Sequence, residues 1–95
     1  MPLNQKVVFK TKLQKQNRIQ IPKIVRWQYK LEPSEILKVT VNVTDSWGAT
    51  ESFLARMYKS GRIRIPNLTY ALLKRNERNK PNLEGYALEV TLEPP

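Results

Sequence analysis

The chain has 95 residues, with 17 lysines and arginines against 8 aspartates and glutamates, a formal net charge of +9, and neither cysteine nor histidine. A chain this short forms a single domain with one core. Without Cys and His, disulfides, thiolate or imidazole metal sites and Ser-His-Asp or Cys-His catalytic sets are excluded, while the positive charge favours a polyanionic partner.

Two strands are the first predicted elements. Val7, Phe9 and Leu13 recur on one side of the first strand, and Ile19 and Ile21 on one side of the second. This alternation is typical of half-buried strands. Asn17, which tolerates a positive φ, stands between them. We therefore expect a tight hairpin.

A helix over Lys23–Leu31 follows Pro22, a residue that suits a first helical turn. Ile24, Trp27 and Leu31 share one face, which we expect to join the core. Pro33 ends this segment, and a third strand over 37–43 then buries alternate positions.

A second copy of this pattern begins after a connector at 44–51. The motif "KQNRIQIP" at 15–22 returns as "KSGRIRIP" at 59–66, 44 positions later, and Gly61, which also tolerates a positive φ, stands at the position of Asn17. We expect repeat 1 over about 5–43 and repeat 2 over about 52–93. In repeat 2 a helix over 68–78 buries Leu68, Ala71 and Leu72, and the third strand is 51 positions from its counterpart. Trp47 in the connector is expected to cap the fold or to be a stacking contact.

Each strand–strand–helix–strand copy is too small to close a core, so the two copies must pack on each other. We expect a mainly β fold with two short helices, a six-stranded pseudo-two-fold barrel, and a monomer. No apolar run approaches the roughly 20 residues of a membrane span and no signal peptide is recognised, so we expect a soluble, cytoplasmic protein.

The stretch "RIQIPKIVRWQYKLEPSEILKVTV" resembles the AbrB-type pattern of prokaryotic transition-state regulators. That resemblance implies a cradle-loop barrel that binds DNA. The fused pair in one chain resembles the small orphan RIFT-type barrels, and the alternative topology is the swapped-hairpin AbrB type. The family's Gly-Asp turn is Ser34-Glu35 in the first copy and Gly85-Tyr86 in the second, so neither copy keeps both residues.

Positive charge is concentrated in the predicted hairpins and helices. Residues 1–31 hold eight basic residues and no acid, and residues 52–80 hold eight basic residues and one acid. A basic two-stranded ribbon fits the major groove of B-DNA, about 12 Å wide. The predicted nucleic-acid-binding residues are Lys10, Lys12, Lys15, Arg18, Lys23, Arg26, Arg56, Lys59, Arg62 and Arg64.

The expected function is therefore transcription-regulator-like binding of duplex DNA through two basic hairpins, without catalysis, cofactor or metal. RNA and acidic proteins are alternative polyanionic partners. A protein-interaction or translation-associated barrel that does not bind DNA is the second hypothesis, and a flavin-binding barrel is a weaker third. Glu32 and Glu35 flank Pro33 in a short turn, which is more typical of a helix end than of a catalytic pair.

Overall fold

The computed structural model describes residues 3–44, 49–74 and 83–95. The fold is mainly antiparallel β-sheet with two short helices, as the sequence predicted. Trp47 and residues 75–82, which include the end of the second predicted helix, lie outside the described residues. The elements are β1 (Val7–Lys12), a 3₁₀ turn η1 (Lys15–Asn17), β2 (Arg18–Gln20), α1 (Lys23–Gln28), β3 (Ile36–Val43), β4 (Thr50–Arg56), β5 (Arg62–Arg64), α2 (Asn67–Lys74) and β6 (Ala87–Glu93).

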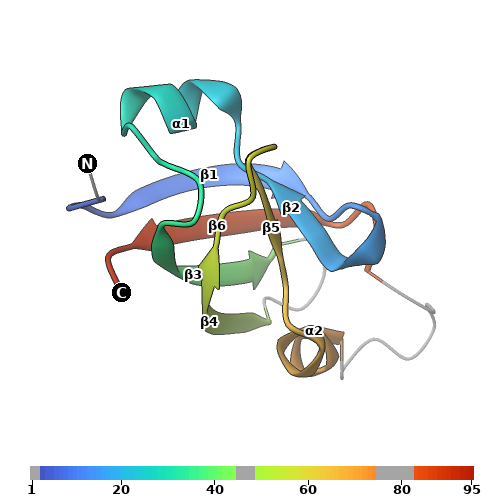
Figure 1. Cartoon of the computed structure of the whole chain (residues 1–95). Coiled ribbons are helices and arrows are strands. Elements are labelled where there is room, and N and C mark those ends of the chain that lie inside the picture. Colours follow the sequence, from blue (N-terminus) through green and yellow to red (C-terminus); the bar gives the residue numbers. More distant parts are fainter. Residues whose placement is uncertain (1–2, 45–48, 75–82) are drawn as a thin grey trace.

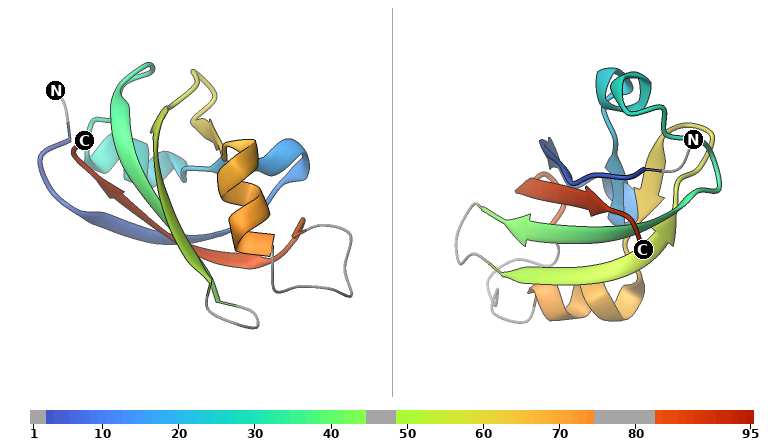
Figure 2. Two further views of the ribbon diagram at one scale, coloured as in Figure 1. Left: turned by 90° about the horizontal axis from the view of Figure 1, so that it is seen from below. Right: turned by 90° about the vertical axis from the view of Figure 1, so that its left-hand side faces the viewer.

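The strands form two sheets. Four strands pair in the order β1-β6-β3-β4, and β2 and β5 pair as a separate two-stranded ribbon. Figure 1 shows this ribbon crossing one face of the larger sheet. The right-hand view of Figure 2 shows α1 and α2 on opposite sides of the molecule. Within the described residues, no helix is long and apolar enough to cross a membrane.

The predicted hairpins are wrong in their pairing. β1 pairs with β6 and β2 with β5, so each strand of a predicted hairpin finds its partner in the other half of the chain. Only the turns close locally: the Gln14 N–H donates to the Arg18 carbonyl at 2.8 Å, and the Tyr58 N–H donates to the Arg62 carbonyl at 2.9 Å. Periodicity identifies a strand and its buried side, but every strand offers the same backbone groups to any partner.

The pairing is reciprocal between the halves. In the ribbon, Ile19 lies opposite Ile63, its repeat equivalent. In the larger sheet, Thr40 lies opposite Thr91, again its repeat equivalent. Such pairs are the pattern that an approximate two-fold axis between two copies produces.

Hydrogen bonds at the two turns are also reciprocal between the halves of the chain. The Ile21 N–H donates to the Gly61 carbonyl at 2.9 Å, and the Ile65 N–H donates to the Asn17 carbonyl at 2.8 Å. Each half therefore holds the turn of the other half in place.

The core lies between the ribbon and the larger sheet and contains only apolar side chains among the described residues. Ile19 and Ile63 are fully buried, as are the alternate residues of β3 from Leu37 to Val43. Burial of this apolar surface drives the two sheets together, at roughly 1.5–3 kcal/mol for each large side chain. The strand alternation read from the sequence is confirmed.

The predicted apolar faces of both helices are wrong in part, although Leu31 is buried as predicted. Ile24 and Trp27 are each 71% exposed, and Leu68 is 74% exposed. In α1, Val25 and Tyr29 pack against the core instead. Five apolar residues between 24 and 31 define two overlapping faces, and a helix of six residues is too short for periodicity to choose between them.

A Schellman motif ends α1 after Gln28, earlier than predicted. The Lys30 N–H donates to the Trp27 carbonyl at 3.3 Å, and the Leu31 N–H donates to the Arg26 carbonyl at 3.0 Å. Lys30 has φ 52°, in the position where glycine is most common. The motif turns the chain so that Leu31 is buried at the end of the helix.

Positive φ values occur at equivalent positions in both copies. Asn17 has φ 58° and Gly61 φ 84°, which confirms the prediction for these two turns. The turns that replace the Gly-Asp pair also agree, with φ 71° at Ser34 and φ 85° at Gly85. The two copies therefore share the backbone conformation of these turns although their residues differ.

Substituting Ser34 with glycine should stabilise the protein by about 1 kcal/mol, because a non-glycine residue in the left-handed region carries a steric cost. Gly85→Ala should destabilise it by a similar amount. An added Cβ at Gly85 would meet no atom within 4 Å, so that variant tests backbone strain alone. Urea unfolding monitored by circular dichroism measures both changes. Equal midpoints for Ser34→Gly and the parent chain would contradict strain at Ser34.

Candidate nucleic-acid interface

The outer side of the β2–β5 ribbon carries three arginines and a glutamine. Because Ile19 and Ile63 point into the core, the residues that alternate with them point outward. Arg18 lies opposite Arg64, and Gln20 lies opposite Arg62. We call this surface, formed by Arg18, Gln20, Arg62 and Arg64, the arginine face.

Arg18 and Arg62 are repeat equivalents and are held in the same manner. Both side chains are half-buried, and the Nε atom of each is buried without a hydrogen-bond partner in the described parts of the chain. A buried unpaired donor costs roughly 1–3 kcal/mol, and like charges on neighbouring strands repel. A bound polyanion would offset the repulsion between the guanidinium groups.

A groove of about 370 Å³ runs beside these two arginines. Its described lining consists of basic and amide side chains only: Gln14, Lys15, Gln16, Arg18 and Arg62. Lys15 and Gln16 come from the η1 turn, which the cross-half hydrogen bond to Asn17 positions against the start of α2. The groove thus combines donors from both halves and suits an anionic ligand such as a phosphate.

Arg26 joins helix α1 to this region. The guanidinium group of Arg26 lies directly over Gly61, so that an added Cβ there would fall 2.5 Å from its central carbon. The Gln20 side-chain amide also donates to the Ser60 carbonyl, at 2.9 Å. Arg26 and Gln20 therefore lie against the turn between β4 and β5, next to Arg62.

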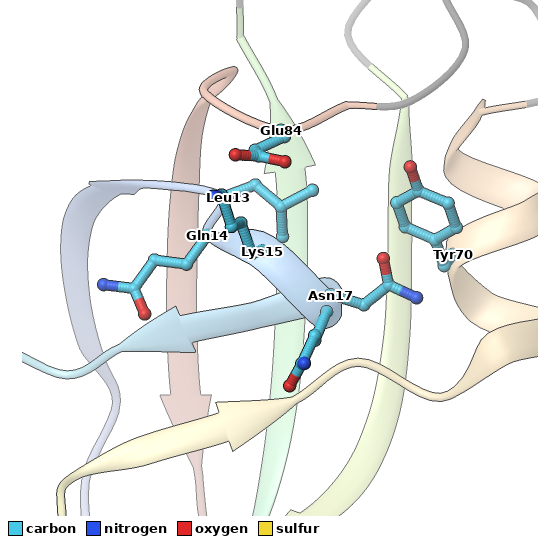
Figure 3. A pocket seen from close by; sticks show the side chains of 7 residues that line it. Leu13, Gln14, Lys15, Asn17, Tyr70 and Glu84 are labelled. Carbon is cyan, nitrogen blue, oxygen red and sulfur yellow. The ribbon is translucent and has the colours of Figure 1, made fainter.

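The position equivalent to Arg26 on the helix of the other half carries a neutral side chain. Tyr70 is the repeat equivalent of Arg26, and it lies near the η1 turn (Figure 3). There it lines a pocket of about 220 Å³ with Leu13, Gln14, Lys15, Gln16, Asn17 and Glu84. The Tyr70 hydroxyl accepts a hydrogen bond from the Leu83 N–H at 2.9 Å. The two turns at the ends of the ribbon therefore have different side chains beside them, Arg26 at one and Tyr70 at the other, although these residues hold equivalent positions in the repeat.

The structure brings together about half of the predicted binding residues. Arg18, Arg62 and Arg64 share the arginine face, Lys15 lines the groove, and Arg26 lies beside them. Two other predicted residues, Lys23 and Lys59, are exposed and close in sequence to this surface. Lys23 is at the start of α1, and Lys59 is in the turn before β5.

Three predicted residues project from another surface. Lys10, Lys12 and Arg56 are exposed on the outer side of the four-stranded sheet, and Lys10 lies opposite Glu89 there. The structure places them apart from Arg18 and Arg62, because β1 pairs with β6 and β4 pairs with β3. Gln20 was missed, although its alternation with Ile19 and Ile21 places it beside Arg18.

No cluster in the described residues contains three Asp, Glu, His or Cys side chains able to hold a metal ion. No family model matches the chain, and no curated protein matches it either. Among solved structures, the chain is similar to the solution structure of PHS018 from Pyrococcus horikoshii, with a TM-score of 0.75 and 22% sequence identity. The match covers 97% of this chain and 91% of that chain, and at this identity it shows the fold alone.

Gly61→Ala should destabilise the protein by the roughly 1–2 kcal/mol of its left-handed backbone and by a small further amount, because the new Cβ would displace the guanidinium end of the flexible Arg26 side chain. In an Arg26→Ala background, the cost of Gly61→Ala should fall to the backbone cost alone. A double-mutant cycle from urea unfolding measures this difference. An equal cost in both backgrounds would contradict the packing of Arg26 on the turn.

Proposed function

We propose that this chain is a non-catalytic nucleic-acid-binding protein, transcription-regulator-like, that contacts duplex DNA through the arginine face. One observation carries the proposal: three arginines from two distant segments share one side of a ribbon, beside a groove whose described lining holds no acid. A guanidinium group can donate two parallel hydrogen bonds to a phosphate or to a guanine edge.

The shape of the ribbon supports duplex DNA as the ligand. The ribbon consists of two antiparallel strands, and a two-stranded ribbon is one of the elements that a major groove admits. Lys15 beside the ribbon would contact phosphate, which positions a protein without reading the base sequence. Arg18 and Arg62 would supply the contacts to base edges or to the opposite backbone.

The proposal includes a closed barrel. We infer that the ribbon and the larger sheet form a six-stranded cradle-loop barrel, RIFT-type or swapped-hairpin, related to the AbrB-type regulators. The reciprocal pairing of the two halves supports this, since one chain then supplies what two chains supply in an AbrB-type dimer. A monomer follows from the same reasoning.

A protein-interaction or translation-associated module is the second candidate function. It is favoured by apolar side chains on the outer side of the four-stranded sheet, away from the arginine face. Ile36 and Leu54 are 42% and 62% exposed there, on the paired strands β3 and β4. A partner bound through these two residues would be retained after nuclease treatment and lost on Leu54→Lys.

Replacing Arg18 and Arg62 together with glutamine should weaken binding to a duplex and make it less sensitive to salt. If about five phosphates are neutralised, log K falls with log salt at a slope near −4 to −5, and each lost phosphate contact reduces the slope by roughly one. Fluorescence anisotropy with a labelled duplex over a salt series measures both quantities.

The matched control is the pair Lys10→Gln and Lys12→Gln, which removes the same charge from the outer side of the sheet. It should weaken binding much less than the double arginine variant. An equal loss would mean that only net charge matters, and no binding of the parent chain at about 50 mM salt would rule out the proposed function.

A further inference from the structure

Trp27 lies in solvent on the exposed side of α1. Its residue surface is 71% exposed, as is that of Ile24 one turn earlier, so neither side chain belongs to the core. The Lys23 ammonium group lies 4.8 Å from the centre of the Trp27 ring, a cation–π contact. A large exposed apolar surface of this kind is typical of a contact site.

The charged residues of α1 and of the chain before it are all positive. Lys23, Arg26 and Lys30 are in or next to α1, and no acid occurs before Glu32. These residues favour an occupant that combines negative charge with a flat apolar surface. A nucleic-acid base joined to its phosphate has both, and stacking on an aromatic side chain does not depend on the base sequence.

The position of α1 connects the ring to the arginine face. Arg26 covers Gly61, which directly precedes Arg62, and α1 follows β2 after two residues. Figure 1 shows α1 at the end of the ribbon, above β1. A nucleic acid on the arginine face that extends toward this end would reach α1 next.

The site is present in one half of the molecule only. The repeat equivalents of Lys23, Arg26 and Trp27 are Asn67, Tyr70 and Ala71. The ring can therefore act at one end of the ribbon. Bases inside a duplex are already stacked on both sides, whereas a base in a single strand has a free face, so an unpaired base is the favoured occupant.

We propose that Trp27 is a stacking site for an unpaired base next to a duplex held on the arginine face, with Lys23 and Arg26 holding the adjoining phosphates. The preferred ligand is a duplex with a single-stranded overhang. This inference rests on the proposed function, and the experiment distinguishes a failure of the stacking site from a failure of the proposed function.

The experiment compares a blunt duplex with the same duplex carrying a short overhang. In a Trp47→Phe chain Trp27 is the single tryptophan, and its fluorescence should be quenched by the overhang ligand much more than by the blunt duplex. Trp27→Ala should weaken binding of the overhang ligand by roughly 5- to 150-fold, the loss of one base–aromatic stack. Its affinity for the blunt duplex should stay unchanged.

The matched control is Leu68→Ala, which removes an exposed apolar side chain from the other helix and should change neither affinity. An unchanged urea midpoint verifies that Trp27→Ala is folded. Equal quenching by both duplexes, or equal affinity of the parent chain and Trp27→Ala for the overhang ligand, overturns the stacking site. The proposed function survives that result if Arg18→Gln with Arg62→Gln still weakens blunt-duplex binding.

Two further ligands test whether Trp27 contacts a lipid surface or responds to negative charge in general. Quenching by vesicles of phosphatidylglycerol and phosphatidylcholine without a response to the overhang would make Trp27 a lipid contact and overturn the inference. Equal quenching by polyglutamate would show that the ring responds to any bound negative charge, with the same consequence. If the double arginine variant binds the blunt duplex as well as the parent chain, the proposed function and the stacking site fall together.

Discussion

The pairing of β2 with β5 across the two halves of the chain is the contact on which the rest of the structure depends. Ile19 and Ile63 lie opposite each other and are fully buried, so the ribbon packs tightly on the larger sheet. The same pairing places Arg18 beside Arg64 on the outside. Apolar burial therefore stabilises the fold and, through strand alternation, also gathers the like charges that form the arginine face.

The two copies share the backbone conformation of their turns and differ in their side chains. Ser34 and Gly85 occupy equivalent left-handed positions, and each donates its N–H to the end of a strand in the other half, at 2.9 Å to Met57 and 2.8 Å to Leu13. Cross-half hydrogen bonds leave the backbone little freedom to change. Side chains outside the core have no such constraint, and the two ends of the ribbon differ accordingly.

These differences in side chains make the end of the ribbon beside α1 chemically different from the end beside α2. Arg26 lies over the turn at Gly61, whereas the equivalent turn at Asn17 lies beside the neutral Tyr70. At the next position, α1 has Trp27 and α2 has Ala71. Reciprocal pairing of the halves combined with a one-sided surface suits a ligand whose two ends differ chemically. The proposed stacking of an unpaired base at one end of a bound duplex is an arrangement of that kind, and it needs no second copy of the chain.

The sequence by itself determined which side of each strand is buried, where φ becomes positive at Asn17 and Gly61, and that the chain repeats. These are local properties, set by side chains two residues apart and by single-residue sterics. Only the tertiary structure decided that β2 pairs with β5, because backbone donors and acceptors are the same in every strand. It also decided that Val25, and not Trp27, faces the core, because a helix of six residues takes its buried side from whatever it packs against.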